Sequence, residues 1–179
     1  MRKSIGSALL LAVLATIPVL GAAQRRGTRT APARSTQRTQ FGLQLDVGTK
    51  TDFGIGGRAV FGLQSLFPGT PLDGIVSFDY YFPSHPSGTS DHVWEINGNL
   101  AYRFRVPARS SLRPYGGGGL NIAHESGSTP AGSFSGTDAD LNILAGTTFR
   151  VQGELTPFLE IRGVVGNANQ VVFTGGVRF

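Results

Sequence analysis

The chain has 179 residues, including 26 glycines, 10 prolines and no cysteine. This length suits one domain, and the lack of cysteine excludes a disulfide scaffold and a cysteine-ligated zinc site. The formal charge of +5 misleads, because residues 40–179 hold nine basic and eleven acidic residues, a net charge of −2. The high isoelectric point comes from the first 39 residues, so it does not indicate nucleic-acid binding.

Residues 1–23 have the pattern of a secretory signal peptide. Arg2 and Lys3 precede an apolar run over 8–20, and small residues follow up to Ala23. We expect cleavage after Ala23 and export across the inner membrane. A membrane anchor is the alternative, but the run is shorter than the roughly 20 residues that a spanning helix needs.

Residues 24–39 contain five arginines among Gly, Pro, Ser and Thr, with almost nothing apolar. This composition predicts a disordered basic linker, because such a segment cannot bury enough apolar surface to fold. We favour a solvated spacer over a tether to anionic headgroups or cell-wall polymer.

From Gln40 onward, apolar and polar residues alternate and helical periodicity is not convincing, which predicts strands. Most of the segments are close to the 9–11 residues that a tilted strand needs to cross a bilayer. The eight segments are 40–48, 53–63, 72–82, 92–106, 112–125, 138–151, 155–165 and 169–179.

One face of these eight segments carries no charge, whereas the other is rich in Asp, Glu, Asn and Arg. Alternation alone does not say which face points outward, and a soluble lipocalin-like barrel is the alternative to a membrane barrel. Aromatic residues decide, because belts at two levels of an apolar band mark the lipid–water boundaries. The predicted upper belt is Phe53, Tyr80, Phe82 and Trp94, and the lower one is Phe41, Phe61, Tyr102, Phe104, Phe149 and Phe179.

The predicted fold is therefore all-β: a closed, antiparallel, eight-stranded up-and-down transmembrane β-barrel over residues 40–179. Closure follows because lipid cannot satisfy the backbone groups of an open sheet edge. The even strand number brings both termini to one side, and the polar segments 83–91 and 126–137 become outer loops.

The barrel resembles the small outer-membrane β-barrels of the OmpA, OmpX and OmpW type. The resemblance rests on the eight-strand pattern, on RPYGGGGLN at 113–121 and on the terminal VVFTGGVRF at 171–179. It implies a monomer in the outer membrane of a Gram-negative-type bacterium, in contact with outer-membrane lipids and lipopolysaccharide. It also implies that the barrel assembly machinery reads Val171, Phe173, Val177 and Phe179. Function varies within this group, so membership does not specify an activity.

The charges predicted to face the lumen form the first candidate site. We favour a salt-bridged plug, because unpaired charges in a narrow interior are costly. A narrow channel for small or hydrophobic solutes is the alternative, since lumen-facing glycines at 54, 56, 62, 117 and 119 leave room. The predicted network is Asp46, Arg58, Asp79, Glu95, Arg103, Arg105, Arg113, Asp140, Arg150, Glu160 and Arg162.

His124, Ser126 and Asp138 offer one enzyme-like set, faintly similar to that of the outer-membrane lipid A deacylase. A base, a hydroxyl and a carboxylate are what an esterase needs, but the Asn that usually follows the Ser is Gly127 here. We therefore expect no enzyme activity. We also expect no cofactor and no metal, because His85 and His92 do not form a ligand cluster.

Overall fold

The computed structural model describes residues 39–83, 90–130 and 132–179. The predicted signal peptide, the linker up to residue 38 and most of the predicted loop 83–91 lie outside the described residues. The strands are β1 (Gln40–Gly48), β2 (Asp52–Gly62), β3 (Leu72–Phe82), β4 (Ser90–Arg103), β5 (Leu112–Thr129), β6 (Gly132–Phe149), β7 (Thr156–Val165) and β8 (Gln170–Arg178).

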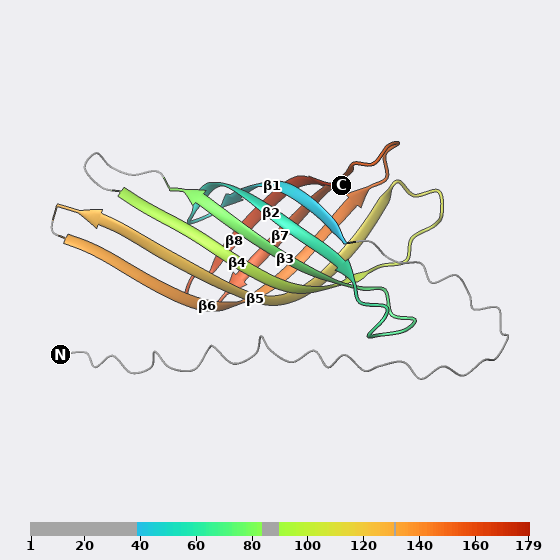
Figure 1. The fold of residues 1–179 in the computed structure, drawn as a ribbon, viewed down its shortest axis with the longest axis horizontal. Helices are drawn as coiled ribbons and strands as arrows, with labels where there is room; N and C mark the ends of the chain where they lie inside the picture. Colours follow the sequence, from blue (N-terminus) through green and yellow to red (C-terminus); the bar gives the residue numbers. More distant parts are fainter. Residues whose placement is uncertain (1–38, 84–89, 131) are drawn as a thin grey trace, which may run out of the picture. The chain divides into compact units, whose positions relative to one another are not determined.

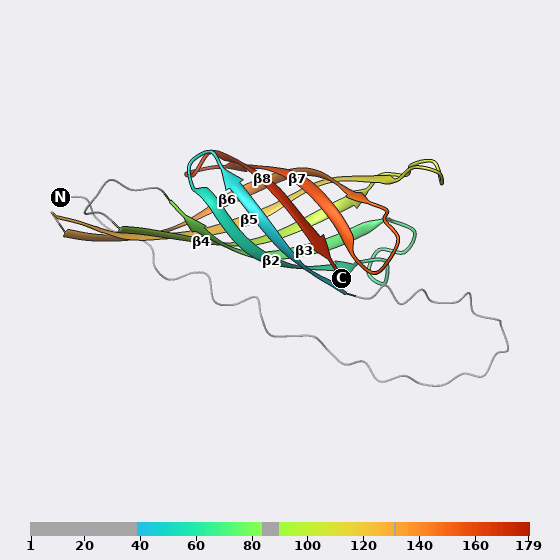
Figure 2. The ribbon, with the colours of Figure 1, turned by 90° about the horizontal axis from the view of Figure 1, so that it is seen from above.

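The strands form a closed barrel in chain order, each antiparallel to its neighbours (Figures 1 and 2). β1 and β8 close it over the register from Gly42–Arg178 to Gly48–Val172. Beyond that register, the backbone N–H of Phe179 donates to the carbonyl of Phe41 at 2.8 Å, and the reverse bond is 3.2 Å. The predicted topology is confirmed. We call the end with Gln40 and Phe179 the inner end, and the opposite end the outer end.

Five of the eight predicted strands agree with the structure to within one residue at each end: β1, β2, β3, β7 and β8. β4 ends at Arg103, three residues before the predicted position. β5 and β6 continue through most of the predicted loop 126–137, pairing from Leu112–Phe149 to Thr129–Gly132. Because β7 pairs with β6 only from Leu141 inward, the hairpin projects beyond it (Figure 1).

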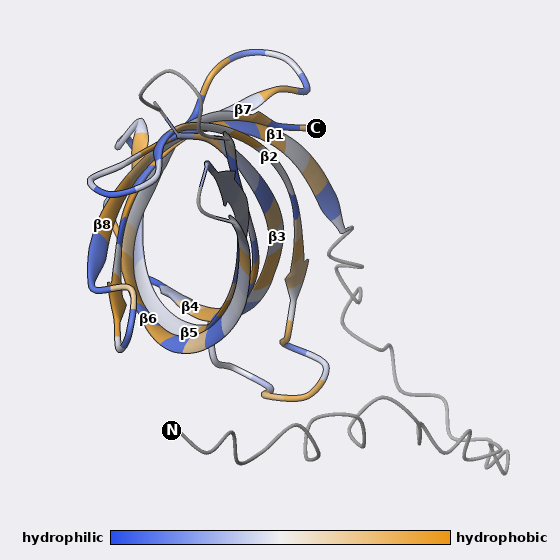
Figure 3. Ribbon diagram, turned by 90° about the vertical axis from the view of Figure 1, so that its left-hand side faces the viewer, coloured by the Kyte–Doolittle hydropathy of each residue, from blue (hydrophilic) through white to orange (hydrophobic). Residues whose placement is uncertain are grey.

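Hydrophobic and hydrophilic residues alternate along the strands (Figure 3), and the uncharged side chains are exposed on the outside whereas the polar ones are buried in the lumen. In β1, Leu43 is 63% exposed, whereas the next residue, Gln44, is 3% exposed. Apolar side chains are exposed in the same alternation around the barrel. A soluble barrel has the opposite arrangement, with its apolar side chains inside and its polar ones outside. None of the described residues forms a helix long and apolar enough to cross a membrane.

Aromatic side chains gather at the two rims of the apolar band, as predicted. At the outer rim, the Phe53–Phe82 and Trp94–His124 ring centroids are 6.3 and 5.1 Å apart. At the inner rim, Tyr102 and Phe104 are in edge contact, with their centroids 5.5 Å apart. Phe149, the last residue of β6, is half-buried like Tyr80 and Trp94 of the outer belt, and it also lines a cavity at the inner end.

Candidate functional site

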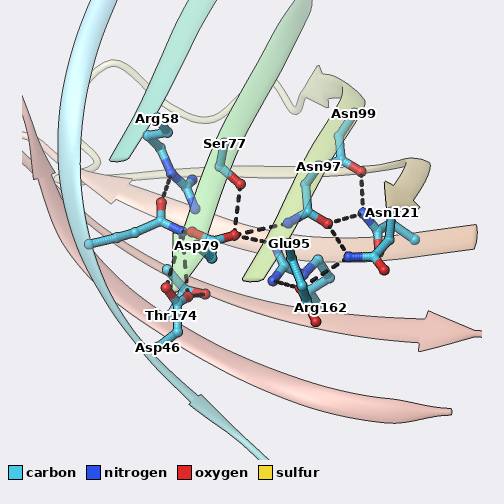
Figure 4. Close-up of polar contacts among 12 residues, drawn as sticks. Asp46, Arg58, Ser77, Asp79, Glu95, Asn97, Asn99, Asn121, Arg162 and Thr174 are labelled. Atoms are coloured by element: carbon cyan, nitrogen blue, oxygen red, sulfur yellow. Dashed lines mark hydrogen bonds and ion pairs between the residues drawn. The ribbon is translucent and has the colours of Figure 1, made fainter. Parts of the chain in front are cut away.

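Charged and amide side chains fill the lumen midway along the barrel (Figure 4). Alternation within each strand places them there, since every second residue points inward. They come from all eight strands, which makes this a site that only barrel closure assembles. Its buried members include Gln44, Asp46, Arg58, Ser77, Asp79, Glu95, Asn97, Asn121, Asn142, Glu160, Arg162 and Thr174.

Arg162 of β7 lies at the centre of one half of this network and is 1% exposed. Its Nη1 is 3.5 Å from Asp79 Oδ2, and its Nη2 is 3.2 Å from Glu95 Oε2. The same Nη2 donates to the phenol oxygen of Tyr81 at 3.2 Å. Arg162 therefore connects one wall of the barrel to β3 and β4 on the other.

Arg58 and Glu160 form a separate ion pair. Both guanidinium Nη atoms of Arg58 lie 3.1 Å from the Glu160 carboxylate oxygens, in a bidentate arrangement. The Tyr115 hydroxyl also donates to Glu160 Oε2 at 2.8 Å. Arg58 stacks on the Phe158 ring at 4.0 Å and donates from Nε to Gln44. Bidentate arginine–carboxylate pairs are among the strongest hydrogen-bonded contacts.

The two arginines of this network, Arg58 and Arg162, cannot by themselves neutralise its four carboxylates, and amide and hydroxyl groups donate the remaining hydrogen bonds. Gln44 Nε2 donates to Asp79 Oδ1 at 2.7 Å, and Thr174 Oγ1 donates to Asp46 at 2.5 Å. Glu95 accepts from Gln170 Nε2 at 2.7 Å and from Asn121 Nδ2 at 3.0 Å. Each of the four carboxylates is thus hydrogen-bonded, whereas Asn121 Oδ1, Asn142 Oδ1 and Arg162 Nε have no partner among the described residues. Connected buried polar groups of this kind rigidify a structure.

The structure brings together six of the predicted network residues: Asp46, Arg58, Asp79, Glu95, Glu160 and Arg162. Two others lie near the ends of the barrel. Arg103 pairs with Asp73 at 3.1 Å, and Asp140 accepts from the Asn167 and Ala168 backbone N–H groups at 2.6 and 3.1 Å.

The prediction was wrong for three arginines, which are exposed at the inner end: Arg105, Arg113 and Arg150. The reason is where the strands end. Arg105 lies beyond the end of β4, Arg150 lies one residue beyond β6, and Arg113 is the second residue of β5. Arg150 donates to the Ala108 carbonyl at 3.3 Å instead of joining the central network.

Large aromatic side chains occupy the volume that lumen glycines leave. A Cβ placed on Gly54 would lie 2.6 Å from the Tyr81 ring, and one on Gly146 would lie 2.5 Å from the Tyr115 ring. Tyr81, Tyr115 and Phe158 are lumen residues that were not predicted, although their position in the alternation indicates this face. Their burial means that the glycines accommodate packing, not an open pore.

Cavities lie at either end of the network. The inner one is about 380 Å³ and the outer one about 280 Å³, and they share no lining residue. The outer cavity is lined by Asp91, Glu125 and Asp138. Glu125 directly follows His124, which stacks on Trp94 of the outer belt. Partial burial, together with the Asp91 and Asp138 carboxylates, raises the pKa of Glu125 above its ordinary value.

The enzyme-like set is not assembled. His124 contacts Thr137 Oγ1 at 2.8 Å, and Asp138 accepts from Asn167 Nδ2 at 3.3 Å. Asp138 lines the outer cavity of the lumen and follows Thr137 in the same strand, so it points to the face opposite His124. His92 is in contact with the Tyr80 hydroxyl at 2.7 Å, and His85 lies outside the described residues. Among the residues that the structure describes, no cluster of His, Cys, Asp and Glu could hold a metal ion.

A closed eight-stranded barrel with an apolar exterior and a charged, packed lumen defines the class of small outer-membrane barrels. The profile of the outer membrane protein beta-barrel domain matches residues 7–178, and the chain belongs to this family. No curated protein matches the chain.

Solved structures show the same fold at low sequence identity. The N-terminal β-barrel domain of Pseudomonas aeruginosa OprF matches at 17% identity and a TM-score of 0.61, over 80% of this chain and 98% of that one. Neisserial surface protein A matches at 19% identity and 0.58, over 78% and 94%. The attachment invasion locus protein Ail of Yersinia pestis matches at 14% identity and 0.53, over 78% and 93%.

Proposed function

We propose that the protein is a structural, surface-exposed barrel of the outer membrane whose lumen is closed by the network around Arg58 and Arg162. Residues 1–23 direct export, and the inner end faces the periplasm. Outer-membrane lipids and lipopolysaccharide surround the apolar band, and the protein is a monomer without enzyme activity. Membership of the family and the exposed apolar band support this location.

The barrel assembly machinery reads the last strand in this proposal. Val171, Phe173 and Phe179 are exposed on the outer face, so the machinery can contact them before the barrel is inserted into lipid. Val177 is half-buried. Phe179 also continues the pairing with Phe41, so the recognised strand is the one that closes the barrel.

The observation that supports a closed lumen is the burial of three ion pairs, Arg58–Glu160, Arg162–Asp79 and Arg162–Glu95. The Arg58 and Glu160 side chains are each 1% exposed, as is Arg162, while Asp79 and Glu95 are fully buried. A solute crossing the barrel would have to separate these pairs, and separating buried charges is strongly unfavourable. The inner and outer cavities are therefore end vestibules and not parts of one pathway.

Two measurements test the proposal. The first is location: we expect the protein in the outer-membrane fraction, with a gel mobility that changes on boiling. Recovery in the soluble fraction, with unchanged mobility, would contradict a membrane barrel.

The second measurement is conductance in planar bilayers. We expect no steady conductance from the native barrel, and openings from an Arg58→Ala, Arg162→Ala double variant. Arg105→Ala serves as the control, since Arg105 is exposed at the inner end. Steady conductance from the native protein would contradict the closed lumen and support the alternative, a narrow channel.

A further inference from the structure

The inner vestibule, the cavity of about 380 Å³ at the inner end, is lined by more cations than carboxylates. Its charged lining residues are Arg103, Arg113, Arg150 and Arg178, with Asp73 as the single acid. Asp73 is already paired with Arg103 at 3.1 Å. In the described part of the chain, the other three arginines make no ion pair with a carboxylate.

Arg178 is the deepest of these cations and is 5% exposed. Its Nη2 donates to the Tyr115 hydroxyl at a long 3.4 Å, and its Nε has no hydrogen-bond partner among the described residues. The guanidinium lies 4.9 Å from the Phe158 ring centroid and 5.5 Å from that of Tyr115. The Glu160 and Asp73 carboxylates attract this cation at a distance, but neither forms an ion pair with it, because each is paired with another arginine, Arg58 or Arg103.

A buried guanidinium without an anion in direct contact is unfavourable, so the protein's own residues leave this site incomplete. Guanidinium groups bind phosphate and carboxylate oxygens through parallel N–H donors, and phosphate offers acceptors to several arginines at once. The hydroxyl-bearing residues Thr148 and Thr156 line the same cavity. Its volume falls within the range of small-molecule sites, about 300–1,000 Å³.

We propose that the inner vestibule binds a small, soluble oxyanion of the phosphate class, with Arg178 as the buried anchor and Arg113 and Arg150 at the rim. The barrel wall separates the cavity from lipid, so the anion enters from the aqueous side at the inner end. Inorganic phosphate and phosphorylated small molecules share this chemistry with lipid headgroups, and the experiment separates these sources.

The test is titration of the purified barrel with inorganic pyrophosphate in a nonionic, phosphate-free detergent at constant ionic strength. We expect saturable binding at one site by calorimetry, with a shift of the Arg178 Nε–H signal in NMR spectra. Arg178→Gln weakens binding at least about tenfold, which corresponds to the loss of one charge-assisted contact. Arg113→Gln weakens it several-fold, because this exposed arginine lines only the rim of the vestibule.

Arg105→Gln is the matched control, since Arg105 is also an exposed arginine near the inner end but does not line the vestibule. Boiling-dependent gel mobility checks that each variant folds. If Arg178→Gln does not fold, the comparison of Arg113→Gln with Arg105→Gln decides. Absence of saturable binding by the native barrel, or equal weakening in those two variants, would overturn the site.

The lipid source is tested by adding phosphatidylglycerol to the micelles, with phosphatidylcholine as the control. We expect neither lipid to displace pyrophosphate. Displacement by phosphatidylglycerol alone would assign the vestibule to a headgroup and contradict a soluble ligand.

Discussion

The guanidinium of Arg162 lies within 3.5 Å of two carboxylates, on β3 and β4, and its own strand is β7. It therefore acts across the lumen, between strands that are not neighbours in the sheet (Figure 4). Backbone pairing connects each strand only to the next, so contacts of this kind are what hold opposite walls together.

We predict that Arg162→Ala lowers the free energy of unfolding by about 3–5 kcal/mol, because it leaves the Asp79 and Glu95 charges buried without their cation. Denaturant unfolding of the folded barrel in micelles measures this difference. Arg105→Ala, at an exposed position, should stay within about 0.5 kcal/mol of the native protein. Similar losses in both variants would show that the central network does not determine stability.

At the scale of the element, β6 combines two environments in one strand. Its inner half lies between β5 and β7 in the apolar band, where Ile143 is 65% exposed. Its outer half pairs only with β5 in the projecting hairpin, where Phe134 is 45% exposed. Both halves have the same strand geometry, so we expect the surrounding medium, lipid or water, to decide whether an exposed position tolerates a charged residue.

Two substitutions in β6 test this difference. Ile143→Arg should cost about 2–4 kcal/mol of unfolding free energy in lipid vesicles, the cost of a cation near the middle of the bilayer. Phe134→Arg should cost no more than about 1 kcal/mol, as expected outside the apolar band. Equal costs at the two positions would contradict the placement of the membrane boundary between them.

The extent of this hairpin is also where sequence prediction of the elements was least accurate. Residues 126–137 are rich in Ser, Gly and Thr, so they lack the apolar alternation that marks a strand. Backbone pairing alone extends β5 and β6 there, from His124–Thr137 out to Thr129–Gly132. A composition that predicts a loop is compatible with a hairpin when each strand has a partner beside it.

For the whole molecule, closure is the property with the clearest dynamic consequence. β1 and β8 are the first and last strands, and in an open sheet they would be edges with unpaired backbone groups. Here they pair with each other as well as with β2 and β7.

Hydrogen exchange should therefore show no frayed seam. We predict that amides of β1 and β8 in their shared register exchange as slowly as those of β3 and β4. Amides near the hairpin tip, between Gly127 and Phe134, should exchange much faster, because local pairing there has few neighbours. Rapid exchange along β1 and β8 would mean that the barrel opens at this seam.

Alternation of residue types by itself determined the strand number, most strand boundaries and the two faces, because residues two apart in a strand share a side. The position of aromatic residues along the strands then indicated which face meets lipid. These are local properties, and folding does not change them.

Only the tertiary structure decided which charges meet. Arg105, Arg113 and Arg150 belong to the same alternation as Arg58 and Arg162, yet the ends of the strands leave them exposed at the inner mouth. Arg58 reaches Glu160 and Arg162 reaches Asp79 across 102 and 83 residues of sequence because closure brings β2 and β3 opposite β7. Pairing across a lumen depends on the height and direction of each strand around the closed barrel, and residue order along a single strand does not contain that information.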